Sequence, residues 1–79
     1  PPGLMAMQRV GTVSRTAQNL AIARCEGAEH PDIGREVVDE SLSSVGRVVD
    51  VFGPVSRPYV AIATSGNPAS LVGEKLYAR

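Results

Sequence analysis

Branched residues interrupted at short intervals by glycine and proline are the feature that most constrains the fold of this chain. Seventeen of the 79 residues are Val, Ile or Thr, and eight Gly and six Pro are distributed among them. Branched side chains favour the extended, pleated backbone, whereas Gly and Pro bend strands or end them. No window of a dozen residues keeps its apolar side chains at helical spacing. The pattern therefore predicts an all-β chain of short strands.

The breaks between apolar runs divide the chain into six expected strands. We place the strands at residues 8–14, 20–25, 36–38, 45–52, 59–63 and 75–77, with 45–52 the longest. Turns or loops are expected at residues 16–19, 26–31 and 39–43. Asn67 can cap a helical turn that has Pro68 at its first position, so we expect at most one short helical turn near residues 68–72.

The tetrapeptide Val-Gly-x-Val occurs twice, at residues 10–13 and 45–48. Gly inside a strand weakens it unless a bend or a close backbone approach requires it. Two bent strands in a short all-β chain indicate a sheet that curls into a barrel, which removes exposed edges. Strict alternation along residues 45–52 places the even-numbered residues on one face and the odd-numbered residues on the other. The first face holds Gly46, Val48, Asp50 and Phe52, and the second holds Val45, Arg47, Val49 and Val51.

The length predicts a single β-barrel domain over residues 8–79, preceded by a disordered or engineered head over residues 1–7. A chain of 79 residues buries only roughly 60% of its unfolded surface, so such domains often depend on disulfides, a metal or a partner. One cysteine, Cys25, and one histidine, His30, exclude a disulfide framework and a zinc site with four Cys/His ligands. We therefore expect a partner protein as the support, with no metal and no cofactor.

The balance of charges narrows the range of partners. Eight Lys and Arg residues offset eight Asp and Glu residues, so the net charge is zero. Nonspecific binding to nucleic acid depends on several unopposed cations, which argues against RNA binding by electrostatics alone. No apolar run approaches the ~20 residues of a membrane-spanning helix, so no membrane partner is expected.

Candidate catalytic groups are sparse, and we predict that the chain is not an enzyme. Cys25 and His30 lie five residues apart, but two such groups are too few for a metal site, and we interpret them as a small core thiol and a solvated loop imidazole. Four carboxylates beside turns are interpreted as solvated surface groups: Asp32, Glu36, Asp39 and Glu40. The sequence contains no nucleophile elbow, phosphate-binding loop or dinucleotide fingerprint.

Residues 50–59 differ from the rest of the chain because they combine aromatic residues with proline. They contain the only Phe, one of the two Tyr and two of the six Pro. Aromatic side chains on a stiff loop lose little entropy on binding, so this segment is a candidate interface. The alternative is that Phe52 and Tyr59 are ordinary core residues, and composition leaves both open. Asp50 is interpreted as a turn carboxylate rather than a partner-facing anion.

Three segments of the sequence carry a resemblance to a known family. They are Pro31-x-Ile33-Gly34-x-x-Val37-x-Asp39-Glu40, Val45-Gly46-x-Val48-x-Asp50-Val51-Phe52-Gly53-Pro54-Val55-x-x-Pro58-Tyr59-Val60 and Leu71-Val72-Gly73-x-Lys75-Leu76-Tyr77. Together these segments resemble the core domain of the Gar family, a small subunit of H/ACA ribonucleoproteins. The resemblance extends over roughly residues 10–77, and the string from Asp50 to Tyr59 is long and specific.

The resemblance implies a six-stranded split β-barrel of the translation-factor and reductase-isomerase type. It implies a noncatalytic subunit that binds the catalytic domain of a TruB-like pseudouridine synthase, the dyskerin homologue, during rRNA pseudouridylation. By influencing a mobile loop over the active site, the subunit would promote loading of substrate RNA and release of product. H/ACA guide RNA and rRNA would be partners only indirectly, through the complex.

This chain lacks the Arg-Gly-Gly-rich tails of eukaryotic members. It therefore resembles the minimal archaeal form, expected in the cytoplasm, or a trimmed eukaryotic core, expected in the nucleolus. The related nuclear assembly factor shares this core domain and remains an alternative.

The motif also implies a set of partner-binding residues, with the aromatics as anchors, the prolines as stiffeners and the glycines allowing close approach. They are Gly46, Val48, Phe52, Gly53, Pro54, Val55, Pro58 and Tyr59. The rival hypothesis is a direct RNA-binding β-barrel of ribosomal or translation-factor type. Its distinguishing feature would be a basic stripe interleaved with stacking aromatics. Such a stripe would consist of Arg9, Arg15, Arg24, Arg47 and Arg57.

Overall fold

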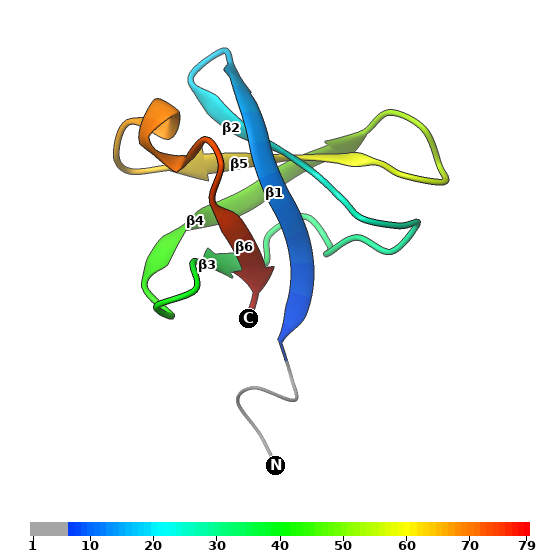
Figure 1. Cartoon of the computed structure of the whole chain (residues 1–79), viewed down its shortest axis with the longest axis horizontal. Coiled ribbons are helices and arrows are strands. Elements are labelled where there is room, and N and C mark those ends of the chain that lie inside the picture. Colours follow the sequence, from blue (N-terminus) through cyan, green and yellow to red (C-terminus); the bar gives the residue numbers. More distant parts are fainter. Residues whose placement is uncertain (1–6) are drawn as a thin grey trace.

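The computed structural model describes residues 7–79, so the expected head over residues 1–7 lies, apart from Met7, outside the described residues. Residues 7–79 form six strands and one short 3-10 turn, and Figure 1 shows how these elements are arranged. In chain order they are β1 (Gln8–Ala17), β2 (Leu20–Arg24), β3 (Glu36–Val38), β4 (Ser44–Phe52), β5 (Tyr59–Thr64), η2 (Pro68–Leu71) and β6 (Lys75–Ala78). The predicted all-β class is confirmed, and so is the single helical turn.

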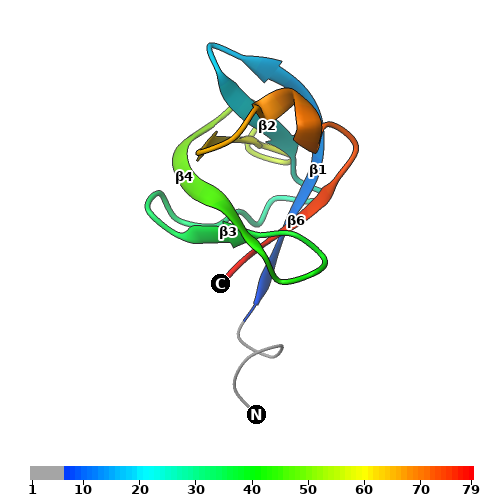
Figure 2. The same cartoon turned by 90° about the vertical axis from the view of Figure 1, so that its left-hand side faces the viewer.

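The six strands form a closed antiparallel barrel. Their order around the ring is β1-β2-β5-β4-β3-β6, and β6 pairs with β1 to close it. Figure 2 shows the strands encircling a common interior. No helix in residues 7–79 is long and apolar enough to cross a membrane.

The two halves of the barrel repeat the same arrangement. The β1–β2 and β4–β5 hairpins occupy equivalent places, and β3 and β6 each pair with the long strand of the other half. Both long strands skip one residue at each of two corresponding points: Val10 and Ser14 in β1, and Val45 and Val49 in β4. These positions are β-bulges, which bend a strand and increase its twist. The two copies of Val-Gly-x-Val therefore mark equivalent corners of the barrel.

The glycine of each tetrapeptide lies against the backbone of the neighbouring strand. A Cβ atom on Gly11 would lie 2.1 Å from the Arg24 carbonyl oxygen, and one on Gly46 would lie 2.0 Å from the Ala63 carbonyl oxygen. Real side chains do not tolerate such distances, so only glycine fits. Of the two reasons considered for glycine inside these strands, a bend or a close backbone approach, the close approach is present at both positions.

The bulges also determine which side chains enter the core. Along β4 the inward positions are Val45, Val48 and Val51, three residues apart, because Val49 is an extra residue between two of them. The prediction of strict alternation along this strand is therefore wrong. The core itself consists of small aliphatic side chains and one thiol: Val10, Val13, Ala21, Ala23, Cys25, Val37, Val48, Val60, Ile62, Leu76 and Ala78.

The predicted end of the first strand and the prediction that residues 45–52 form the longest strand are wrong, whereas the cap of η2 is as expected. β1 continues to Ala17 and is the longest strand at ten residues, because the turn that follows is only Gln18 and Asn19. Both turn residues have positive φ, which fits the two-residue hairpins that follow the twist of their strands. At η2, the side-chain oxygen of Asn67 accepts a hydrogen bond from the Ala69 N–H at 3.0 Å.

Candidate functional site

The β4–β5 hairpin ends in a stack of aromatic rings. Phe52 and Tyr59 are cross-strand partners, and their ring centroids lie 5.5 Å apart with an angle of 20° between the planes. Arg24 pairs with Tyr59 from the other side, and its guanidinium carbon lies 5.4 Å from the Tyr59 ring centroid. Because β2 and β4 flank β5, Tyr59 is held between a cation and a second ring. Such contacts stabilise aromatic groups beyond their buried area and fix their orientation.

The loop between the two aromatics, residues 53–58, is tied to the end of β2. The Arg57 side chain donates a hydrogen bond from Nε to the Cys25 carbonyl oxygen at 2.9 Å. In return the Cys25 N–H donates to the Pro58 carbonyl oxygen at 3.0 Å. Within the loop, the Arg57 N–H donates to the Pro54 carbonyl oxygen at 3.1 Å. Two prolines and three hydrogen bonds therefore hold the loop in one shape before any partner arrives.

The structure separates the eight predicted partner-binding residues into two groups. Six gather at the hairpin end: Phe52, Gly53, Pro54, Val55, Pro58 and Tyr59. Val55 is 88% exposed and Phe52 is 37% exposed, whereas Pro58 is buried beneath them. Gly46 and Val48 lie elsewhere on β4, where Gly46 fits against β5 and Val48 is 1% exposed in the core. These two residues support the barrel.

Exposed apolar side chains continue from the hairpin end along β4. Ile33 is 63% exposed and Val49 is 41% exposed, and the hydrogen bond from the Gly34 N–H to the Val48 carbonyl oxygen brings their segments together. We call Ile33, Val49, Phe52 and Val55 the apolar stripe. Sequence reasoning did not assign Ile33 or Val49 to a site. Ile33 was part of the quoted motif, but no pattern revealed the bulge that turns Val49 outward.

A shallow hollow of about 190 Å³ lies beside the apolar stripe at the hairpin end. It is lined by Ala28, His30, Val51, Phe52, Gly53, Pro54, Val55 and Pro58. His30 is exposed, and its ring nitrogen Nδ1 lies 3.1 Å from the Pro31 carbonyl oxygen. The prediction of a solvated loop histidine is thus confirmed, although its position on the wall of this hollow was not foreseen.

Cys25 does not join His30 in a chemical site. Its side chain is buried in the core, as predicted, and burial raises the pKa of the thiol. A buried thiol with a raised pKa is a poor nucleophile. Across residues 7–79, no three His, Cys, Asp or Glu side chains gather in a way that could hold a metal ion. The features of the hairpin end are those of a contact surface.

Comparison with known proteins identifies the family. A model of the Gar1/Naf1 RNA binding region matches residues 7–79. The chain belongs to this family. Among curated proteins, an uncharacterised protein from Methanocaldococcus jannaschii is 37% identical over 54 residues, which are 68% of this chain and 63% of the relative. The chain therefore spans less than two thirds of that relative's length.

A solved structure of the Gar1 domain of Naf1 has the same fold. It superposes with a TM-score of 0.68, covers 91% of this chain and 80% of its own, and is 20% identical. The predicted membership in the Gar family is confirmed by the family match, and the predicted barrel is confirmed by the fold. The description of the matching family model is that of an RNA binding region.

Proposed function

We propose that the chain is a noncatalytic subunit of an H/ACA guide-RNA ribonucleoprotein. In this proposal it binds the catalytic domain of a TruB-like pseudouridine synthase and promotes loading of substrate RNA and release of product. The match of residues 7–79 to the Gar1/Naf1 family is the observation that carries the proposal. The organism of the relative, Methanocaldococcus jannaschii, agrees with the archaeal form of the subunit. In this proposal that form acts in the cytoplasm.

The apolar stripe and the hollow beside it support a contact with a protein. Val55 exposes 88% of its surface on a loop that is already held in place by Arg57 and Pro58. An apolar side chain that is exposed and pre-ordered contributes to binding without a large loss of entropy. The hollow beside it offers a concave surface for a side chain from the partner. Interfaces concentrate their binding free energy at such central anchors.

A subunit without catalytic groups can still set the turnover of an enzyme. Product release and movement of loops over an active site limit the rate of many enzymes. A rigid barrel docked beside such a loop changes the stability of its open and closed positions. The effect expected from this chain is therefore on multiple turnover and not on the chemical step.

The experiment measures binding of the cognate synthase to matched valine variants. Val55 and Val72 are both exposed, but Val72 follows η2 and lies outside the apolar stripe. We expect Val55→Ala to weaken binding by ~2 kcal/mol, about 30-fold, and Val72→Ala to leave it unchanged. Calorimetric titration gives the affinities, and pseudouridine formation with excess substrate gives the turnover. Equal affinities for the two variants would place the interface elsewhere, and no binding by the unaltered chain would refute the proposal.

A further inference from the structure

Among the residues that the structure describes, His30 is the one polar side chain on the walls of the hollow at the hairpin end. The other lining residues contribute apolar side chains or, at glycine, backbone: Ala28, Val51, Phe52, Gly53, Pro54, Val55 and Pro58. In a hollow of this kind the apolar walls supply most of the contact, and the single polar group selects what is bound. The chemistry that His30 presents therefore determines which side chain fits.

The hydrogen bonding of the His30 ring leaves it as an acceptor toward a partner. Its Nδ1 lies 3.1 Å from the Pro31 carbonyl oxygen. A carbonyl oxygen only accepts hydrogen bonds, so Nδ1 carries the hydrogen of the neutral ring, and Nε2 keeps a lone pair without a hydrogen. His30 is exposed, so Nε2 is hydrated in the free chain. A partner that covers the hollow has to replace that hydration with a donor of its own.

The backbone that carries His30 is fixed on both sides of the residue. Pro31 follows it directly and is fully buried, and a residue before proline is restricted to extended backbone. On the other side, the Cys25 N–H donates to the Pro58 carbonyl oxygen at 3.0 Å, which ties the start of the loop to the hollow. The acceptor is therefore positioned before a partner arrives, and little entropy is lost on binding.

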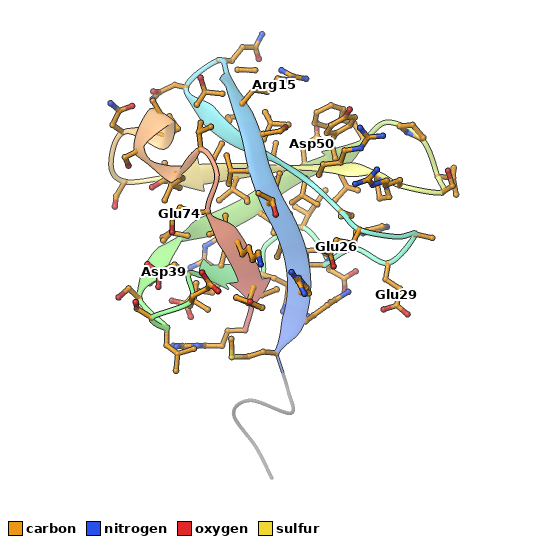
Figure 3. All side chains as sticks on the ribbon, in the orientation of Figure 1. Arg15, Glu26, Glu29, Asp39, Asp50 and Glu74 are labelled. Atoms are coloured by element: carbon orange, nitrogen blue, oxygen red, sulfur yellow. The ribbon has the colours of Figure 1, made fainter. Side chains whose placement is uncertain are left out.

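Charged groups lie around the hollow but not on its walls. They are Glu26, Glu29 and Asp32 on the loop of His30, Asp50 on β4 and Arg57 on the loop that follows β4. Figure 3 shows Glu26, Glu29 and Asp50. Glu26 pairs with Arg9 at 3.3 Å, and the Asp50 carboxylate accepts the Val51 N–H at 2.8 Å. No carboxylate of residues 7–79 lines the hollow, so a lysine or arginine side chain would be buried there without a counter-ion, which is costly.

From these contacts we infer that the hollow receives a tyrosine or tryptophan side chain of the partner, and that His30 selects it. The ring packs against Phe52 and the two prolines, and its O–H or N–H donates to Nε2 of His30. Tyr and Trp combine a large apolar body with a donor at one edge, and they are enriched among the residues that dominate interfaces. Phe or Leu would fill the same space but leave Nε2 without a donor. The inference rests on the proposed function, because the partner synthase supplies the side chain.

The first measurement is made on the chain alone. Nitrogen-15 NMR of the imidazole nitrogens distinguishes the two neutral tautomers of His30. We expect the hydrogen on Nδ1, as the contact with the Pro31 carbonyl oxygen requires. A hydrogen on Nε2 would present a donor instead of an acceptor and would overturn the inference without reference to the synthase.

The second measurement is calorimetric titration of the cognate synthase with His30 variants. His30→Phe keeps a ring without the acceptor, and we expect affinity to fall about 5- to 150-fold. His30→Gln supplies an acceptor oxygen and should lose less, whereas Glu29→Gln, on the same loop outside the hollow, should bind like the unaltered chain. Protonation turns Nε2 into a donor, and histidine changes its charge between about pH 5 and 8. Affinity of the unaltered chain should therefore fall from pH 8 to pH 5 by more than that of His30→Gln.

The third measurement identifies the bound side chain by changing the exposed tyrosines and tryptophans of the synthase to Phe, one at a time. One replacement should weaken binding to the unaltered chain but not to His30→Phe, because the two groups form one contact. Replacements that all weaken both chains equally would overturn the inference. Weakened binding by Val55→Ala with full binding by His30→Phe would also overturn it and leave the proposed function standing. Absence of binding by the unaltered chain would refute the proposed function and this inference with it.

Discussion

Replacement of Gly46 by alanine tests whether this part of the family motif serves the barrel or the partner. The added Cβ would lie 2.0 Å from the Ala63 carbonyl oxygen, 2.9 Å from its carbonyl carbon and 3.1 Å from the Thr64 Cα. All three are backbone atoms, so β4 has to move away from β5. Overpacking of this kind costs about 1–3 kcal/mol, and each weakened ladder hydrogen bond adds about 1 kcal/mol. We therefore expect Gly46→Ala to lower the free energy of unfolding by about 3 kcal/mol.

That loss is a large part of the stability expected for a domain of this size, about 4–12 kcal/mol. At about 4–8 °C per kcal/mol, it lowers Tm by about 12–24 °C. The assay is thermal and guanidinium unfolding followed by circular dichroism. Gly27→Ala is the matched control, because nothing lies within 4 Å of its added Cβ, and Gly11→Ala should behave like Gly46→Ala. Equal Tm values for Gly46→Ala and Gly27→Ala would refute the reasoning. They would mean that the close approach of β4 and β5 does not require glycine at position 46.

Substitutions at two positions and one labelling experiment test other contacts. Tyr59→Ala removes the ring between Phe52 and Arg24, so we expect it to lower the free energy of unfolding by about 2 kcal/mol. Tyr59→Phe keeps the ring and should change that free energy by less than about 0.5 kcal/mol in the same unfolding assay. Asn67→Ala removes the acceptor for the Ala69 N–H and should lower the free energy of unfolding by about 1 kcal/mol, with Ser65→Ala as the surface control. Cys25 is buried and the pKa of its thiol is raised, so iodoacetamide at pH 8 should alkylate it only at the rate at which the chain unfolds globally. Labelling at the rate of a free thiol would contradict its place in the core.

The number and kind of strands could be predicted because they depend on local properties. Branched residues and regular breakers gave six strands, and the Asn67–Pro68 pair gave the start of η2. The residues at which the strands end could not be predicted as well. The turn after β1 consists of only Gln18 and Asn19, and both have positive φ although neither is glycine. Because this turn is so short, β1 extends beyond the length that composition indicates.

Bulges determine whether a side chain of β4 faces the core or the solvent. A pattern of strict alternation does not predict where these bulges occur. One extra residue at Val49 reverses the direction of every later side chain in β4 relative to a regular strand. As a result Val51 packs against the core, and Val49 joins the apolar stripe. The stack of Arg24, Tyr59 and Phe52 was hidden for a different reason. Arg24 lies far from the other two residues in sequence and reaches Tyr59 only through the register of β2 and β5.

The repeated architecture of the two halves indicates where function was added to the barrel. The β1–β2 hairpin closes with two residues, Gln18 and Asn19, which is the shortest connection that the strand twist favours. The equivalent β4–β5 hairpin closes with residues 53–58, which carry both loop prolines and lie between Phe52 and Tyr59. Nothing in the packing of the barrel requires this longer loop, since the first half closes without one. A longer, rigid and apolar connection in one of two equivalent positions is therefore the feature on which the proposed protein contact depends.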